Sequence, residues 1–146
     1  MDTSRILIRP FKLSDADDFL RWASDDRVTR YLRWNTVTTK EEALTYIEKS
    51  GDNKCRAYVS YAVGAAYWGQ GIVSSAALRA VMSSVFDEFP DLVRLEALVD
   101  IENRASQRVL EKVGFLKEGL LRKYGFCKGE VRDMFMYSFL STDKSL

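Results

Sequence analysis

Residues 68–72, Trp-Gly-Gln-Gly-Ile, join a strand-like stretch to a long apolar helix, and this junction constrains the fold more than any other part of the chain. The strand is expected over Ala57–Val63 and the helix over Gly71–Phe89. Two glycines at such a junction allow a tight turn that presents consecutive backbone N–H groups at a helix N-terminus. Those donors and the helix dipole favour a phosphate or pyrophosphate. Gly69 and Gly71 therefore indicate either an anion site or a tight turn without a ligand, and both interpretations stay open at this point.

The length and the charge of the chain limit the classes of protein to which it can belong. A chain of 146 residues fits a single domain with a real core, and 22 basic against 21 acidic residues give no reason to expect binding to nucleic acid or to a membrane surface. No run reaches the roughly 18 apolar residues of a membrane helix, and the N-terminus has no signal-peptide core. Cys55 and Cys127 lack metal-ligand spacing. They are interpreted as reduced thiols of an intracellular protein, cytoplasmic or else nuclear.

The chain contains no histidine, which removes several chemistries at once. Ser-His-Asp catalysis, Cys-His catalysis and histidine-based zinc sites are all excluded. Any acid–base chemistry must then use a carboxylate, Tyr, Ser, Cys, Lys or ordered water. No metal is expected.

The order of expected elements indicates one α/β domain, residues 1–146, with a mixed sheet. Ser14 is expected to cap the first helix, and Thr38 or Thr39 the second, each with a glutamate three residues on in the spacing of a capping box. Gly114 is expected to end the last helix. In chain order the elements are a strand Arg5–Arg9, a helix through Phe19–Trp22, a helix from Thr38 or Thr39 to Lys49, the strand Ala57–Val63, the helix Gly71–Phe89, a strand Leu92–Val99, a helix Asn103–Val113 and two strands, Glu118–Phe126 and Val131–Leu140.

The glycine junction does not match the common nucleotide-binding loops. Gly64 and Gly69 have the separation of a P-loop, but Gln70 and Gly71 stand where that loop needs Lys and Ser or Thr. A dinucleotide fingerprint also fails, because Ser74 stands where the third glycine should be. The loop itself has no Lys or Arg, so an anion would be held mainly by backbone donors.

A second segment favours a ligand at the junction. Asp100–Ser106 follows a strand and opens a helix that closes with Glu111–Phe115. Asn103 taken alone is best interpreted as a helix cap. Together, Trp68–Ile72 and the pattern Asn103-x-x-Ser106 with Glu111-Lys112-x-Gly114-Phe115 resemble the GNAT superfamily of N-acetyltransferases. The opening Leu7–Phe11 with Asp15–Asp18, and the ending Gly129, Asp133 and Tyr137, resemble the RimJ/RimL branch of ribosomal-protein N-terminal acetyltransferases.

The resemblance implies an α/β (α+β) fold with a mixed, mostly antiparallel central sheet, about four flanking helices and a splayed strand pair at the cleft for coenzyme A. The pantetheine arm of acetyl-CoA would pair with strand backbone before the loop, and the pyrophosphate would lie on the loop amides. Asn103 would contact pantetheine, and Ser106 would lie near the thioester sulfur. The cofactor-binding residues implied are Tyr61, Ala62, Val63, Tyr67, Trp68, Gly69, Gln70, Gly71, Ile72, Asn103 and Ser106.

The reaction that the resemblance implies is direct transfer of acetyl from acetyl-CoA to a primary amine on a protein N-terminus, a lysine or a small molecule. Ser106 would act as the donor on the sulfur side and Glu118 as the base, while a strand amide near Ala62 or Val63 would stabilise the oxyanion. Two positions depart from the family pattern: Ala66 replaces a Gln or Arg, and Leu110 replaces a tyrosine acid. Glu118 as a solvated strand-edge acid and Ser106 as a plain helix-face hydroxyl remain alternatives.

Two further functions stay open: a non-catalytic acyl-CoA-binding or regulatory domain of the same fold, and an unrelated nucleotide-binding enzyme. The amine acceptor, a peptide or a small molecule, is the expected partner, and the protein is expected to be a monomer or a homodimer. Relatives build three antiparallel strands before the loop where this sequence offers one. We expect that a hairpin is missing near residues 50–57, and that residues omitted from the sequence, rather than a true deletion, account for it.

Overall fold

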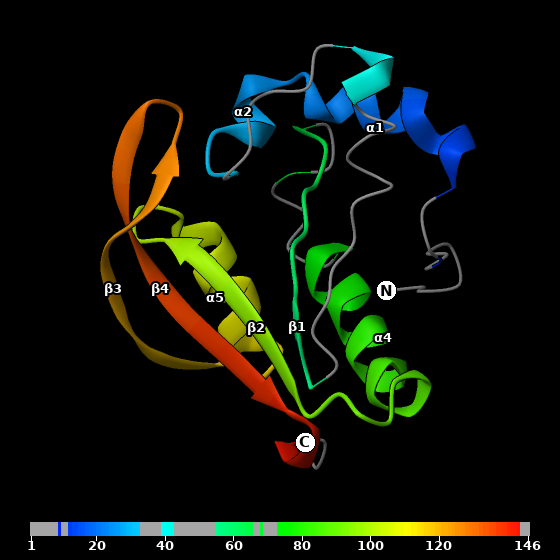
Figure 1. Ribbon diagram of the computed structural model, residues 1–146, viewed down its shortest axis with the longest axis vertical. Helices are drawn as coiled ribbons and strands as arrows, with labels where there is room; N and C mark the ends of the chain where they lie inside the picture. The colour runs from blue at the N-terminus through cyan, green and yellow to red at the C-terminus, as the bar shows by residue number, and fades with distance from the viewer. Residues whose placement is uncertain are drawn as a thin grey trace.

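A computed structural model describes residues 9, 12–32, 39–42, 55–65, 68 and 73–143. Its helices and strands follow the expected order along the chain (Figure 1). They are the 3₁₀ turn Leu13–Asp15, α1 Ala16–Ala23, α2 Asp26–Thr29, β1 Arg56–Tyr58, α4 Val73–Glu88, β2 Arg94–Asp100, α5 Arg104–Lys112, β3 Leu116–Cys127, β4 Glu130–Leu140 and the 3₁₀ turn Ser141–Asp143.

The described strands form one mixed sheet in the order β1-β2-β4-β3. β1 pairs with β2 in parallel, from Arg56 opposite Arg94 to Tyr58 opposite Glu96. β2 pairs with β4 antiparallel along its whole length, and β4 pairs antiparallel with β3. The sheet is therefore mixed and mostly antiparallel, which confirms the expected fold class.

The hairpin of β3 and β4 turns at Lys128 and Gly129, where the sequence predicted it. Both residues have positive φ, 50° and 83°. That backbone suits a two-residue turn, because its twist matches the right-handed twist of the strands, and glycine adopts it without strain. β3 extends beyond its expected bounds at both ends, β4 begins one residue earlier than expected and ends at Leu140 as expected, and the pairing contains two irregularities of register, between Lys117 and Gly119 and between Leu121 and Gly125.

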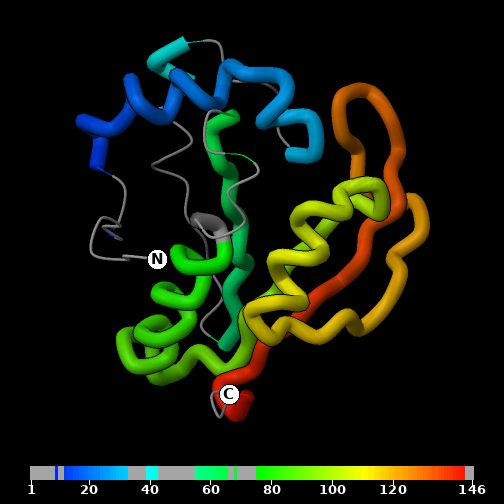
Figure 2. The backbone as a smooth tube through the Cα atoms, turned by 180° about the vertical axis from the view of Figure 1, so that it is seen from behind, coloured from blue at the N-terminus to red at the C-terminus, as the bar shows by residue number. Residues whose placement is uncertain are grey.

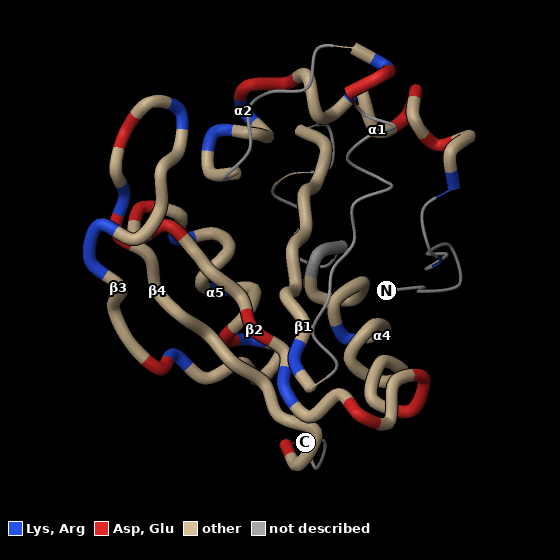
Figure 3. The backbone as a smooth tube through the Cα atoms, in the orientation of Figure 1, with Lys and Arg blue, Asp and Glu red and all other residues tan. Residues whose placement is uncertain are grey.

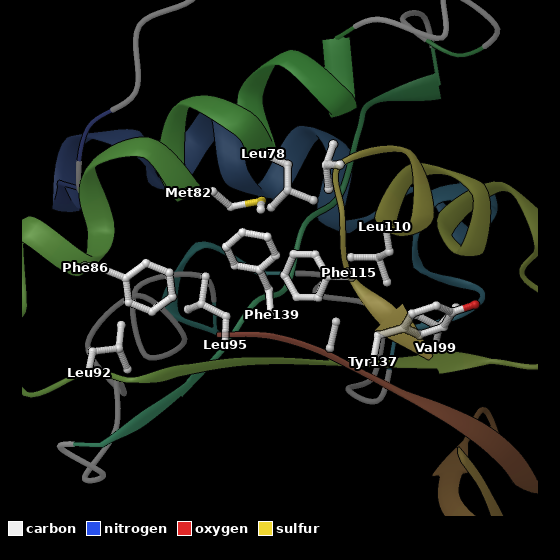
Figure 4. Close-up of a cluster of buried hydrophobic side chains, with 12 residues drawn as sticks. Leu78, Met82, Phe86, Leu92, Leu95, Val99, Leu110, Phe115, Tyr137 and Phe139 are labelled. Atoms are coloured by element: carbon white, nitrogen blue, oxygen red, sulfur yellow. The ribbon is translucent and has the colours of Figure 1, made fainter. Parts of the chain in front are cut away.

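The main core lies between one face of the sheet and the helices α4 and α5 (Figures 2 and 4). α4 contributes Leu78, Met82 and Phe86, whose spacing of four residues places them on one stripe of the helix. Phe89, the last residue of the expected helix, lies just past the end of α4 and is 59% exposed, so it does not belong to this stripe. From the strands and α5 the buried members are Leu92, Leu95, Ala97, Val99, Leu110, Val113, Phe115, Tyr137 and Phe139.

The N-terminal helices form a separate unit above the sheet. α1 is confirmed, but Ser14 lies inside the preceding 3₁₀ turn and Asp15 occupies the cap position of α1. The capping box at Thr39 is present: the Thr39 hydroxyl accepts the N–H of Glu42, and the Glu42 carboxylate accepts the N–H of Thr39. α2 was not expected. The Cys127 thiol donates to the carbonyl of Leu32 at 2.9 Å, which joins the end of α2 to the β3–β4 hairpin.

Several expectations lie outside the described residues. They include the strand Arg5–Arg9 apart from Arg9 itself, most of the helix from Thr39 to Lys49, and residues 50–54 of the segment where a hairpin is expected to be missing. Within the described part, no helix has both the length and the apolar character needed to cross a membrane.

Candidate active site

The two parallel strands β1 and β2 separate where β1 ends. Their last hydrogen bond runs from the N–H of Val59 to the carbonyl of Glu96, at 2.7 Å. β2 continues to Asp100 while it stays paired with β4, but among the described residues no backbone hydrogen bond joins 60–63 to it. Figure 1 shows the strands together at their lower ends and apart at their upper ends. The expected splayed strand pair is therefore present, and it starts at Val59 and Glu96.

The first turn of α5 lies at the upper end of β2, on the same side as the splay. Gln107 fixes it there: its buried side-chain amide donates to the carbonyl of Asp100 at 3.2 Å and to that of Ile101 at 2.9 Å. The Asp100 carboxylate accepts the N–H of Glu102 at 2.8 Å. These bonds tie the strand end to the helix start, so α5 cannot shift without exposing buried polar groups.

Asn103 and Ser106 both lie in this turn, as the sequence predicted. The side-chain oxygen of Asn103 accepts the N–H of Ser106 at 3.2 Å, which is the bond of a helix cap. Capping uses only that oxygen, and the side-chain N–H donors of Asn103 have no acceptor in the described part of the chain. The helix cap and a contact to a ligand are therefore compatible at this residue.

Tyr61 spans the splay. Its hydroxyl donates to the backbone carbonyl of Ser106 at 3.3 Å, while its ring packs against the main core. Burial raises the pKa of this phenol. Residues 57–65 carry no charged side chain, and the upper part of β1 is uniformly tan in Figure 3. The β1 side of the splay therefore consists of backbone groups, hydroxyls and apolar side chains.

Only one residue of the expected anion loop is described. The N–H of Trp68 donates to the carbonyl of Ala65 at 3.2 Å, and its indole N–H donates to the carbonyl of Val63 at 2.7 Å. These bonds hold Trp68 against the end of the β1 segment, five residues before α4 begins at Val73. The other loop residues, Tyr67, Gly69, Gln70, Gly71 and Ile72, lie outside the described residues.

Glu118 is held by an arginine and a serine. Its carboxylate pairs with both terminal nitrogens of Arg94, at the first residue of β2, and accepts the hydroxyl of Ser138 at 2.6 Å. Ser138 is paired with Glu96, the residue at which the splay begins, whereas Ser106 follows the last residue of β2. Figure 3 shows acidic and basic segments side by side at the lower ends of β1 and β2.

The partners of Glu118 also oppose the role of a base. The hydrogen bonds from Arg94 and Ser138 lower the pKa of Glu118 to about 2. A carboxylate with so low a pKa takes up a proton poorly at neutral pH. The ion pair of Glu118 favours the alternative of a structural role, next to the buried carboxylate of Glu96, to which Arg94 also donates at 2.7 Å; the role of Glu118 as a base stays a prediction.

Two features of the site were not expected from the sequence. One is the anchoring role of Gln107, for which its place on the buried stripe of α5 with Leu110 was an available signal. The other is the contact between Tyr61 and Ser106, two residues 45 positions apart in the chain. No local pattern gives such a pairing.

The sequence matches the family model described as Acetyltransferase (GNAT) domain over residues 5–63 and 48–116. The chain belongs to the GNAT family of acetyltransferases. It is 29% identical over 172 aligned residues to the uncharacterized N-acetyltransferase p20 of Bacillus licheniformis, an alignment that covers 97% of this chain and 96% of the relative. The enzyme is thus an N-acetyltransferase with acetyl-CoA as its co-substrate, and the resemblance found in the sequence is confirmed.

Solved structures of related enzymes share this fold. RimJ of Mycobacterium smegmatis, in complex with CoA-disulfide, superposes with a TM-score of 0.78 at 21% identity, over 94% of this chain and 83% of that one. Spermidine N-acetyltransferase from Vibrio cholerae, in complex with CoA and spermine, superposes with a TM-score of 0.80 at 15% identity, over 96% and 98%. At these identities the likeness concerns the fold. Among the described residues, no group of three His, Cys, Asp or Glu side chains could hold a metal ion.

Proposed function

We propose that this GNAT enzyme transfers acetyl directly from acetyl-CoA to the α-amino group at the N-terminus of an acceptor polypeptide, and that the transfer takes place at the splay between β1 and β2. The observation that carries the proposal is the end of pairing at Val59 and Glu96, beyond which two extended segments face each other without hydrogen bonds. Backbone N–H and C=O groups that are not paired within the sheet are available to a ligand, so the splay fits a ligand that itself carries amide groups.

The pantetheine arm of acetyl-CoA has such amides. In the proposal its amides pair with the backbone of Tyr61, Ala62 and Val63, and the free side-chain N–H donors of Asn103 bind the arm from the other side. An N–H at Ala62 or Val63 would stabilise negative charge on the acetyl oxygen, and Ser106 would lie beside the sulfur.

The pyrophosphate would bind at the loop before α4. There the proposal places it on the backbone amides of the loop, in line with the positive end of the α4 dipole. The loop residues in question are Tyr67, Trp68, Gly69, Gln70, Gly71 and Ile72.

The chemistry at the splay favours an α-amine over a lysine or a polyamine. In the described part of the chain, no carboxylate side chain is hydrogen bonded to Tyr61, Asn103 or Ser106, and the carboxylate of Glu118 is paired with Arg94. An acceptor that deprotonates easily needs the least help there. At pH 7 about one α-amine in ten is neutral, against roughly one lysine amine in 2,500.

The test is a screen of acceptors by release of the coenzyme A thiol. The panel pairs a peptide with a free N-terminus and no lysine with the same peptide N-acetylated and given one lysine, and adds spermidine. The proposal expects the first peptide to react at least tenfold faster than the other two. Turnover of spermidine or of the lysine peptide without the α-amine peptide would refute the acceptor class while leaving the acetyltransferase assignment intact.

The state of the cysteines bears on where the enzyme acts. Cys55 is exposed and Cys127 is buried, and neither is part of a disulfide. Reduced cysteines persist in reducing compartments, so we propose that the enzyme acts in the cytoplasm.

A further inference from the structure

We propose that Tyr61 gives the proton to the sulfur of the departing coenzyme A, an inference that rests on the proposed placement of acetyl-CoA at the splay. Tyr61 belongs to the unpaired continuation of β1, and its hydroxyl reaches across the splay to the first turn of α5. It therefore stands between the two segments that would enclose the thioester.

The present hydrogen bond of Tyr61 leaves its proton available. The distance of 3.3 Å from its hydroxyl to the carbonyl of Ser106 exceeds the usual O–H···O range of about 2.5–3.0 Å, so the bond is weak. A small rotation about the side-chain torsions can exchange it for an acceptor placed beside Ser106. The ring keeps its place meanwhile, because it packs against the core on the same strand face as Ala57 and Val59.

The acidity of a phenol suits this step better than that of the other hydroxyl at the site. A free phenol titrates near pKa 10 and a free thiol near 8.5, so a phenol is much closer in acidity to the departing thiol than an alcohol is. The aliphatic hydroxyl of Ser106 is a far weaker acid. Burial raises the pKa of Tyr61, which keeps the phenol protonated through the physiological range and makes it a weaker acid than a free phenol. The hydroxyl of Tyr137, the neighbouring phenol, already donates to the carboxylate of Glu111 at 2.8 Å.

The step balances as follows. The neutral amine of the acceptor forms a C–N bond to the acetyl carbon, and the C–S bond breaks with its electron pair on sulfur. Tyr61 gives its hydroxyl proton to that sulfur, which leaves as the thiol. The nitrogen releases a proton to solvent, and the phenolate of Tyr61 takes one back.

The test measures the sulfur directly, without acceptor and without turnover. The ultraviolet absorbance of the thiolate reports the pKa of the thiol of bound coenzyme A, titrated on the wild type and on Tyr61→Phe. A phenol that donates to sulfur stabilises the thiolate, so its removal is expected to raise that pKa by about 1. In the acetyltransferase assay kcat is expected to fall roughly tenfold, with KM for acetyl-CoA within about twofold of the wild type.

Two matched variants complete the design. Tyr137→Phe removes a phenol hydroxyl that is bonded to Glu111, and it is expected to leave the pKa of the bound thiol unchanged. Ser106→Ala is expected to move that pKa less than Tyr61→Phe does. An unchanged pKa in Tyr61→Phe, or a larger change in Ser106→Ala, would overturn the role of Tyr61.

The outcomes separate this inference from the proposed function. If the wild type binds no coenzyme A, both proposals are refuted. If it binds coenzyme A but Tyr61→Phe leaves the pKa of the bound thiol unchanged, the role of Tyr61 is refuted and the proposed function stands. Should Tyr61→Phe lose the ability to bind coenzyme A, 3-fluorotyrosine at position 61 keeps the ring and acidifies the phenol. The bound thiol pKa is then expected to fall below that of the wild type, and an unchanged value would refute the inference.

Discussion

Replacement of Glu118 by glutamine separates the two roles considered for this residue. If Glu118 is part of the structural network at the lower end of β2, Glu118→Gln should lower stability and leave catalysis nearly unchanged. Hydrogen bonds from Arg94 and Ser138 together lower the pKa of Glu118 to about 2, and a shift of that size corresponds to about 3 kcal/mol without screening. The Glu118 side chain is 43% exposed, so solvent screens the pair, and we expect a loss of roughly 1 kcal/mol.

The pH dependence of this loss has a definite sign. Because the pKa of Glu118 is lower in the folded state than in the unfolded chain, its contribution is present above pH 4.5 and disappears as the pH falls toward about 2. The free energies of unfolding of the wild type and Glu118→Gln should therefore differ at pH 7 and converge at the acid end. Thermal unfolding across this range measures the difference, which at pH 7 corresponds to roughly 3 °C in Tm.

The control for this variant is Glu130→Gln. Glu130 also pairs with an arginine, Arg132, but its side chain is 66% exposed, so its removal is expected to cost less than about 0.5 kcal/mol. For Glu118→Gln we expect kcat within twofold of the wild type. A folded Glu118→Gln enzyme that lost tenfold or more in kcat would refute the structural reasoning and restore Glu118 as a base.

Three further predictions concern the sheet end, the anion loop and the last helix. Arg94→Met should lower the free energy of unfolding by roughly 3 kcal/mol in denaturant titrations, because it leaves the buried Glu96 carboxylate with only Arg56, whose nitrogen lies 3.6 Å away; a loss below 1 kcal/mol would contradict it. Gly71→Val should abolish binding of coenzyme A in calorimetry while Gln70→Ala stays within about threefold, since the backbone holds the pyrophosphate; equal losses would refute that account. Gly114→Ala should lower Tm by several degrees, as its φ is +101° and an added Cβ would lie 3.3 Å from Phe139; an unchanged Tm would show that the turn relaxes.

Local patterns were sufficient to predict most elements of this fold. Helix α5 follows from its capping residue Asn103, its apolar stripe and Gly114, and the hairpin turn follows from Lys128 and Gly129. These signals lie within a few residues of one another, and the capping bonds and turn geometry that they indicate also act over a few residues. α2 was not predicted because it is only one turn long, Asp26–Thr29, and so short a helix has no periodic apolar stripe.

The place of Glu118 could not be derived in this way. Its partners, Arg94 and Ser138, lie 24 and 20 residues away in the chain, and they meet it only after β2, β3 and β4 have paired in register. The sequence showed a carboxylate at the start of a strand. Which end of the sheet that strand start occupies depends on strand order, and the pKa of the residue depends on the arginine that it meets there.

The comparison with a relative bears on the missing hairpin. The alignment with p20 of Bacillus licheniformis extends over 172 residues, whereas this chain has 146, so the relative contains residues without a counterpart here. We propose that they form the strands that the sequence does not offer before Ala57, and that the omission lies between residues 50 and 57. Intact-protein mass spectrometry of the protein from its native cells would show the additional mass if the residues were omitted from the sequence, and no additional mass if the deletion is real.

The proposed active site depends on where backbone pairing between β1 and β2 ends, which the pattern of side chains does not indicate. The sequence predicted a strand over Ala57–Val63, yet the structure pairs only Arg56–Tyr58 with β2. The alternation of faces nevertheless continues beyond the last pair, because Ala57, Val59 and Tyr61 all pack against the same core. The pattern of apolar residues indicates which face of a strand a side chain lies on, whereas backbone pairing depends on the distance to the next strand. The continued alternation places the Tyr61 hydroxyl against the first turn of α5, and the lost pairing leaves the backbone of 60–63 without hydrogen bonds to β2, so the proposed site requires both.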